Sequence, residues 1–169
     1  MRALVYMLSV GTALLAGCGG SSSEATSDPL SFYVVSEKKI EGGRFIDTAD
    51  FPKLGYIAAA PDLVVTRLEA VAPDISREQS VTMDKDGKEA VGPWRERAGF
   101  HISMHAAEAR KFNALTEQTV GKQVLVMLGD SPLIAARVMS PISTGRLFMT
   151  FGENADINKI EHALKKLVR

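Results

Sequence analysis

The order of apolar segments from residue 99 onward constrains the fold of this chain more than any other feature. Phe100, Ile102 and Met104 alternate with other residues, so 99–104 is expected to form a strand with these three on one face. Over 107–119 the apolar positions recur three and four residues apart, which predicts a helix. The segments that follow predict a buried strand at 123–128, its hairpin return at 133–139, a strand at 146–151 and a second helix at 156–168.

The preceding residues contribute further strands. Short apolar or β-branched runs predict strands at 32–35, 63–71 and 80–83, with a less defined element at 55–60 and a turn at 84–87. Strands and helices in this order predict an α+β domain, in which a mostly antiparallel sheet carries two helices packed on one face. Residues 31–169 are sufficient for one such domain with a single core.

The first 17 residues have the layout of an export signal. One positive charge, at Arg2, precedes an uncharged stretch from Ala3 to Gly17 that is rich in Leu, Val and Ala. At about 1.5 Å per helical residue, this stretch is too short to cross a hydrocarbon core of about 30 Å comfortably. Residues 1–17 are therefore interpreted as a removable signal peptide.

Leu15, Ala16, Gly17 and Cys18 are similar to a bacterial lipobox, in which small residues precede the cysteine that receives lipid. Cys18 is the only cysteine, lies where cleavage is expected and precedes a polar linker. We therefore expect Cys18 to carry a diacylglycerol and an amine-linked acyl chain, which together anchor the protein to a membrane. An ordinary secretory signal cleaved near Gly17, which would leave a free thiol, is the alternative.

Residues 18–30 are predicted to form the lipidated, flexible tether, because Gly, Ser and other polar residues dominate them. Gly19 stands where lipoproteins retained in the inner membrane of two-membrane bacteria often carry aspartate, which favours the outer membrane. The expected location is the cell envelope, facing the periplasm in such a bacterium. Cleavage before Cys18 would remove only Arg2 among the charged residues and leave 19 basic and 20 acidic side chains, a balance that argues against nucleic-acid binding.

A series of motifs runs through residues 100–168. The helical sequence Glu-Ala-Arg-Lys-Phe-Asn-Ala-Leu-Thr at 108–116 precedes Val-Gly-Lys at 120–122, Leu-Gly-Asp at 128–130 and Pro-Ile-Ser-Thr-Gly at 141–145. In this order the motifs resemble the head of the first periplasmic domain of SecD, a subunit of the bacterial preprotein translocase (SecD or fused SecDF). The return strand at 135–139 and the segment at 151–154 depart from that family's pattern.

This resemblance implies an α+β head that contacts unfolded polypeptide during export. The sequence shows none of the transmembrane helices of SecD, so we do not expect it to couple a proton gradient to movement. A membrane-tethered copy of the head that retains polypeptide binding is the expected arrangement.

The sequence does not predict catalysis or a metal site. His101 and His105 have the spacing of a helical zinc pair, but on a strand they would lie roughly 13 Å apart. The carboxylates of 84–89 fit a solvated hairpin turn better than an incomplete calcium loop. No serine or free cysteine has the surroundings of a nucleophile. We therefore expect no catalytic residue, no metal and no cofactor other than the lipid on Cys18.

Four side chains are candidates for contact with a protein or peptide partner. Trp94, the sole tryptophan, lies in a segment with Pro and Gly, where it either anchors a partner or fills a satellite of the core. The second placement is the preferred interpretation. Arg137, Arg146 and Phe148 would line an exposed sheet face, and a free strand edge there would capture an extended peptide by strand addition.

Together these features predict a lipid-anchored envelope protein that is not an enzyme and that binds protein or peptide at a membrane surface, in contact with exported polypeptides or the export machinery. A structural or assembly adaptor that binds one folded envelope partner is the alternative. A hydrolase would require an acid, base or nucleophile arrangement that the sequence does not show.

Overall fold

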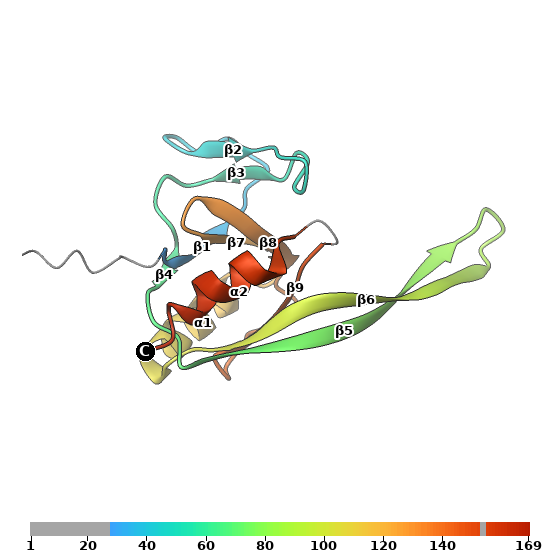
Figure 1. Cartoon of the computed structure of the whole chain (residues 1–169). Helices are drawn as coiled ribbons and strands as arrows, with labels where there is room; N and C mark the ends of the chain where they lie inside the picture. The colour runs from blue at the N-terminus through green and yellow to red at the C-terminus, as the bar shows by residue number, and fades with distance from the viewer. Residues whose placement is uncertain (1–27, 153–154) are drawn as a thin grey trace, which may run out of the picture.

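The structure is a computed structural model that describes residues 28–152 and 155–169 (Figure 1). The predicted signal peptide, the lipobox at 15–17 and Cys18 lie outside these ranges. Nine strands and two helices make up the described part: β1 (Leu30–Val34), β2 (Arg44–Ile46), β3 (Gly55–Ile57), β4 (Leu63–Val65), β5 (Ala70–Met83), β6 (Glu89–Ser103), α1 (Ala106–Gln118), β7 (Gln123–Leu128), β8 (Ser131–Arg137), β9 (Arg146–Thr150) and α2 (Ile157–Lys165).

A four-stranded antiparallel sheet with the order β4-β1-β7-β8 forms the centre of the molecule. β1 and β7 are buried on both faces, so both strands are apolar almost throughout. Their register pairs Leu30 with Leu128 and Phe32 with Val126, and these side chains belong to the main core. The residues between them, such as Leu125 and Met127, point to the opposite face.

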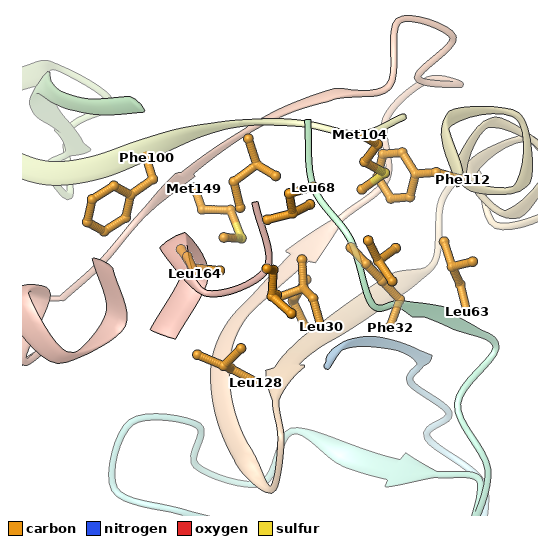
Figure 2. Packing of buried hydrophobic residues seen from close by; sticks show 14 of the residues in the cluster. Leu30, Phe32, Leu63, Leu68, Phe100, Met104, Phe112, Leu128, Met149 and Leu164 are labelled. Atoms are coloured by element: carbon orange, nitrogen blue, oxygen red, sulfur yellow. The ribbon is translucent and has the colours of Figure 1, made fainter. Parts of the chain in front are cut away.

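Both helices contribute to the main core on the first face. Phe112 of α1 packs against Phe32 with ring centroids 5.1 Å apart, and Leu164 of α2 is fully buried in the same cluster. Figure 2 shows Phe100 of β6 and Met149 of β9 joining this cluster from the second sheet, whose order is β5-β6-β9. The predicted α+β class, with two helices on one face of an antiparallel sheet, is therefore confirmed.

The β2–β3 hairpin covers the second face of the central sheet. Ile46 and Ile57 pack there against Tyr33, Leu125 and Met127 in a separate apolar cluster. No strand was predicted over β2, because three residues are too few to show a period of two.

β5 and β6 form a long antiparallel hairpin, called the arm below. It pairs Ala70 with Ser103 at its base and Met83 with Glu89 near its tip. β9 pairs only with Gly99–Ser103, and Figure 1 shows the rest of the arm projecting away from the body. At the tip, Asp84 Oδ1 accepts backbone hydrogen bonds from Asp86 and Lys88, which closes the predicted turn.

The strand predicted at 63–71 is confirmed only at its two ends, because the chain breaks after β4 and resumes as β5 at Ala70. Leu68 turns into the core there, where it is fully buried, and its N–H donates to the carbonyl of Leu167 at 2.8 Å. α2 also ends earlier than predicted, at Lys165, since Leu167 is drawn into the same core. The short strands predicted at 80–83 and 99–104 are the distal end of β5 and the base of β6.

Candidate functional site

β8 is the last strand of the central sheet, and no strand of the described residues pairs with its outer side. At its end, the N–H of Val138 donates inward to the carbonyl of Lys122 at 2.9 Å. Because backbone groups alternate in direction along an antiparallel strand, the N–H groups of Ala135 and Arg137 point outward. The edge therefore presents main-chain donors and acceptors to an added strand.

A hollow of about 600 Å³, called the first hollow, runs along the first part of this edge. Ile134 and Ala135 both line it, although their partners Val126 and Leu125 face opposite sides of the sheet. The hollow therefore extends across the edge rather than over one face. α2 forms part of the far wall, and the lining includes five charged residues: Asp28, Asp50, Arg97, Asp156 and Lys159.

A second hollow, of about 270 Å³, lies at the other end of β8. Apart from Thr116, Arg137 and Ser140, its walls are apolar side chains of β1, α1, β7, β9 and the end of β8 with the segment after it, including Phe112, Leu115 and Val124. The hydroxyl of Thr116 also lines it, but it already donates to the carbonyl of Asn113 and accepts from the N–H of Ile142, each at 2.9 Å. Among the described residues that line this hollow, Arg137 alone carries a charge.

Beyond its buried base, the arm carries exposed apolar side chains on one face. Directly paired residues share a face of an antiparallel ribbon, and the register places five large side chains on the same face as buried Phe100. Each of the five is more than half exposed: Ile75, Val81, Met83, Val91 and Trp94. The salt bridge between Arg77 and Glu96, 2.9 Å long, is the charged pair within this face.

The opposite face of the arm is polar. Near the base, His101 Nε2 lies 2.8 Å from Asp74 Oδ2, and its ring stacks on Phe148 of β9 with centroids 4.4 Å apart. The pKa of Asp74 is lowered from its ordinary value of 3.8, first because the N–H of Ile75 donates to this carboxylate and then because His101 does. Further out, Arg97 Nε pairs with Glu78 at 3.0 Å.

The structure separates the four residues predicted to contact a partner. Trp94 is 65% exposed on the apolar face of the arm, so the placement in a satellite of the core is wrong. Arg137 ends β8 and lines the second hollow. Arg146 and Phe148 lie on β9, in the other sheet, on the face that carries His101. The free strand edge exists, but these residues do not line one surface with it.

Sequence reasoning missed the other apolar residues of the arm. Ile75, Val81 and Met83 have the even spacing of one strand face, but Arg77 and Gln79 interrupt the pattern. The two-residue spacing that continues through Arg77 and Gln79 was the signal that could have predicted one continuous strand face.

The two histidines considered as metal ligands have different partners. His101 contacts Asp74, whereas His105 Nε2 lies 2.9 Å from the carbonyl oxygen of Arg169. Within residues 28–152 and 155–169, no group of three or more His, Cys, Asp or Glu side chains is placed to hold a metal ion.

Comparison with known proteins gives a likeness of fold. No protein-family profile and no curated protein matches the chain. A solved structure titled "Structure and function of a membrane component SecDF that enhances protein export" matches with 18% sequence identity and a TM-score of 0.50, over 82% of this chain and 61% of that one. "Crystal structure of SecDF in Super-membrane-facing form" matches with 17% identity and a TM-score of 0.48, over 84% of this chain and 18% of that one.

The first match confirms, at the level of fold, the predicted resemblance to a SecD domain. The chain spans less than two thirds of the matched SecDF chain. None of the helices in the described residues has the length and apolar character needed to cross a membrane.

Proposed function

We propose that this chain is a lipid-anchored envelope protein, not an enzyme, that binds extended segments of exported polypeptides along the free edge of β8. The observation that carries the proposal is an unpaired strand edge with hollows along both of its halves. The SecDF fold supports it, because the matched protein is described as a membrane component that enhances protein export.

Strand addition suits a binder of many sequences. Main-chain hydrogen bonds to the β8 edge would supply affinity without regard to sequence, while alternate side chains of the bound segment would enter the hollows. Pro132, near the start of β8, lacks an N–H and restricts pairing at that end. The edge from Ile134 to Arg137 is therefore the expected binding segment.

The proposed tether would hold this edge near a membrane. Asp28 lines the first hollow, so the tether enters the body beside the proposed binding site. Residues 18–27 would have an r.m.s. reach of roughly 17 Å as a flexible Gly/Ser-rich chain. A polypeptide bound at β8 would then lie close to the surface in which the lipid on Cys18 is anchored, with the outer membrane favoured by Gly19.

N-methylated peptides test strand addition without altering the protein. A binding peptide would be methylated on alternate backbone nitrogens, in two sets of opposite phase, and its affinity measured by fluorescence anisotropy. We expect one set to lose binding, because its methylated nitrogens face β8, and the other set to retain it. Equal affinity of both sets with the unmodified peptide would refute pairing with the strand edge.

A second function is favoured by the apolar face of the arm. An isolated two-stranded ribbon is marginally stable in water, and five exposed apolar side chains on one face mark a protein-contact surface. A further hollow of about 450 Å³, between the arm base and α2, extends this surface to Ile157. The protein would then act as an adaptor that binds one folded envelope partner through the arm.

Substitutions on the two faces of the arm distinguish this adaptor function from peptide binding. Trp94→Ala with Met83→Ala should release a folded partner captured from the envelope while leaving peptide affinity unchanged. Thr82→Ala, on the polar face, is the matched control. Loss of peptide binding in the double variant would place the peptide site on the arm instead.

A further inference from the structure

We infer that the second hollow is an anchor site for one bulky apolar side chain of the bound polypeptide, and that Arg137 selects segments with an acidic side chain next to that residue. This inference rests on the proposed strand addition and defines which segments bind best. Nothing in the likeness of fold assigns a role to this hollow.

The size and lining of the hollow suit one large side chain. A cavity of about 150 Å³ lined by Leu, Ile and Phe accepts a benzene ring, so about 270 Å³ accommodates a Phe, Leu or Met side chain. The walls from α1 and β7 are apolar, and the hydrogen bonds of Thr116 are already made within the protein. Ser140, in the segment after β8, is the other hydroxyl of the lining, and it is exposed to solvent. A polar side chain that entered among the apolar walls would therefore lose water and find few hydrogen-bond partners.

The position of the hollow couples it to the strand edge. Ala136 and Arg137, the last two residues of β8, both line it. Because side chains alternate between the faces of a strand, every second residue of an added strand would face the helix side, where the hollow opens. A bound segment paired with the end of β8 thus has one side chain in reach of the hollow.

Arg137 supplies the charge preference. Its side chain is exposed and forms no hydrogen bond or ion pair with another residue of 28–152 or 155–169. None of the described residues that line the hollow is acidic, so none competes for the guanidinium. A carboxylate on the bound segment would form a charge-assisted, two-pronged hydrogen bond with the guanidinium. The complementary ligand is therefore an apolar side chain with an acidic neighbour, in an extended chain.

Guest residues in a host peptide provide the test. The lipoprotein, produced from its full chain and held in lipid nanodiscs, would be titrated with a ten-residue polar host peptide. One guest position would carry Ala, Leu or Phe, and its neighbour Asn or Asp. We expect Leu or Phe to tighten binding about ten- to a hundredfold over Ala. Asp should add roughly a further three- to tenfold at low salt.

Protein variants assign these preferences to the hollow. Arg137→Gln should abolish the preference for Asp over Asn while leaving the preference for Leu over Ala, whereas Arg146→Gln, on the other sheet, should change neither. Ala136→Leu narrows the hollow and should abolish the preference for Leu, whereas Ala135→Leu, on the opposite face of β8, should preserve it.

Three results would overturn the inference. If all peptides bind with equal affinity whatever their guest residues, strand addition remains possible but the hollow is not an anchor site. Arg137→Gln weakening Asp and Asn peptides equally would remove the charge selection. Binding of decanoate by the hollow, with no peptide bound by the protein, would replace the peptide by a fatty acid and contradict the proposed function as well.

Discussion

Asp74 and His101 join the arm to β9 at the scale of single residues. The carboxylate of Asp74 accepts from the backbone of Ile75 and from His101, whose ring in turn stacks on Phe148. All of these groups lie on the polar face of the arm base, and both members of the Asp74–His101 pair are more than half exposed. The pair therefore orients side chains at the junction rather than forming part of the core.

The lowered pKa of Asp74 predicts how this junction responds to pH. Since its folded pKa lies below its ordinary value of 3.8, the ionised carboxylate stabilises the fold above that value, and this contribution is lost as the pH falls through the folded pKa. Asp74→Asn should therefore lower the unfolding midpoint at pH 5 and above, and the difference from the parent should shrink below pH 4. Asp130→Asn controls for the loss of one surface charge. A difference that stays constant from pH 7 to pH 3 would contradict the prediction.

The residue scale also shows what the sequence could not supply. The lipobox prediction rests on the types of four adjacent residues and needs no fold, and the candidacy of Arg137 rests on a charge within an apolar strand. The placement of Trp94 was wrong, because an aromatic side chain on a Gly/Pro segment is buried only if other elements of the fold pack against it. The grouping of Arg146 and Phe148 with Arg137 was wrong. Strand order decides which residues share a face, and the sequence does not give the strand order.

At the scale of elements, local patterns were sufficient where the element is buried or helical. The predicted bounds of β7 match the structure, and α1 begins and ends within one residue of its predicted span. The length of the arm was not predictable in this way. Cross-strand pairing sustains it far from the core, and its exposed strands lack the alternation that marks a half-buried sheet.

Gly99 controls the pairing of the arm with β9. A Cβ at this position would meet the carbonyl oxygen of Met149 at 2.5 Å and the ring of Phe148 at 2.9 Å. Gly99→Ala should therefore force β6 and β9 apart and lower the free energy of unfolding by about 1–3 kcal/mol. A Cβ on Gly152 meets no described atom within 4 Å, so Gly152→Ala is the control in urea denaturation. Equal urea midpoints for the two variants would show that β9 can move away from β6 without a loss of stability.

At the scale of the whole molecule, the proposed binding edge and the proposed contact arm lie on different sheets. β8 ends the central sheet beside the point where the described chain begins, whereas the arm extends from the second sheet (Figure 1). If the proposed functions hold, this division would allow one protein to bind an extended segment near a membrane and to reach a folded partner farther away. The membrane location in this arrangement depends on the proposed anchoring of Cys18.

Anchoring is tested by moving the thiol. Labelled palmitate should be incorporated into the parent chain, which should fractionate with membranes, and Cys18→Ser should abolish incorporation. Combining Cys18→Ser with Ser21→Cys restores a thiol outside the lipobox and should not restore labelling. Label in that double variant, or none in the parent, would contradict lipidation at Cys18.

The central claim is that the β8 edge binds exported polypeptides in the envelope. A photo-crosslinking residue at Ala135 in the living cell, followed by mass spectrometry of the captured proteins, measures this directly, with the same residue at Arg146 as the control. The account predicts that position 135 captures many unrelated exported polypeptides and that position 146 does not. Capture of a single folded envelope protein at position 135, or of no protein there, would contradict it.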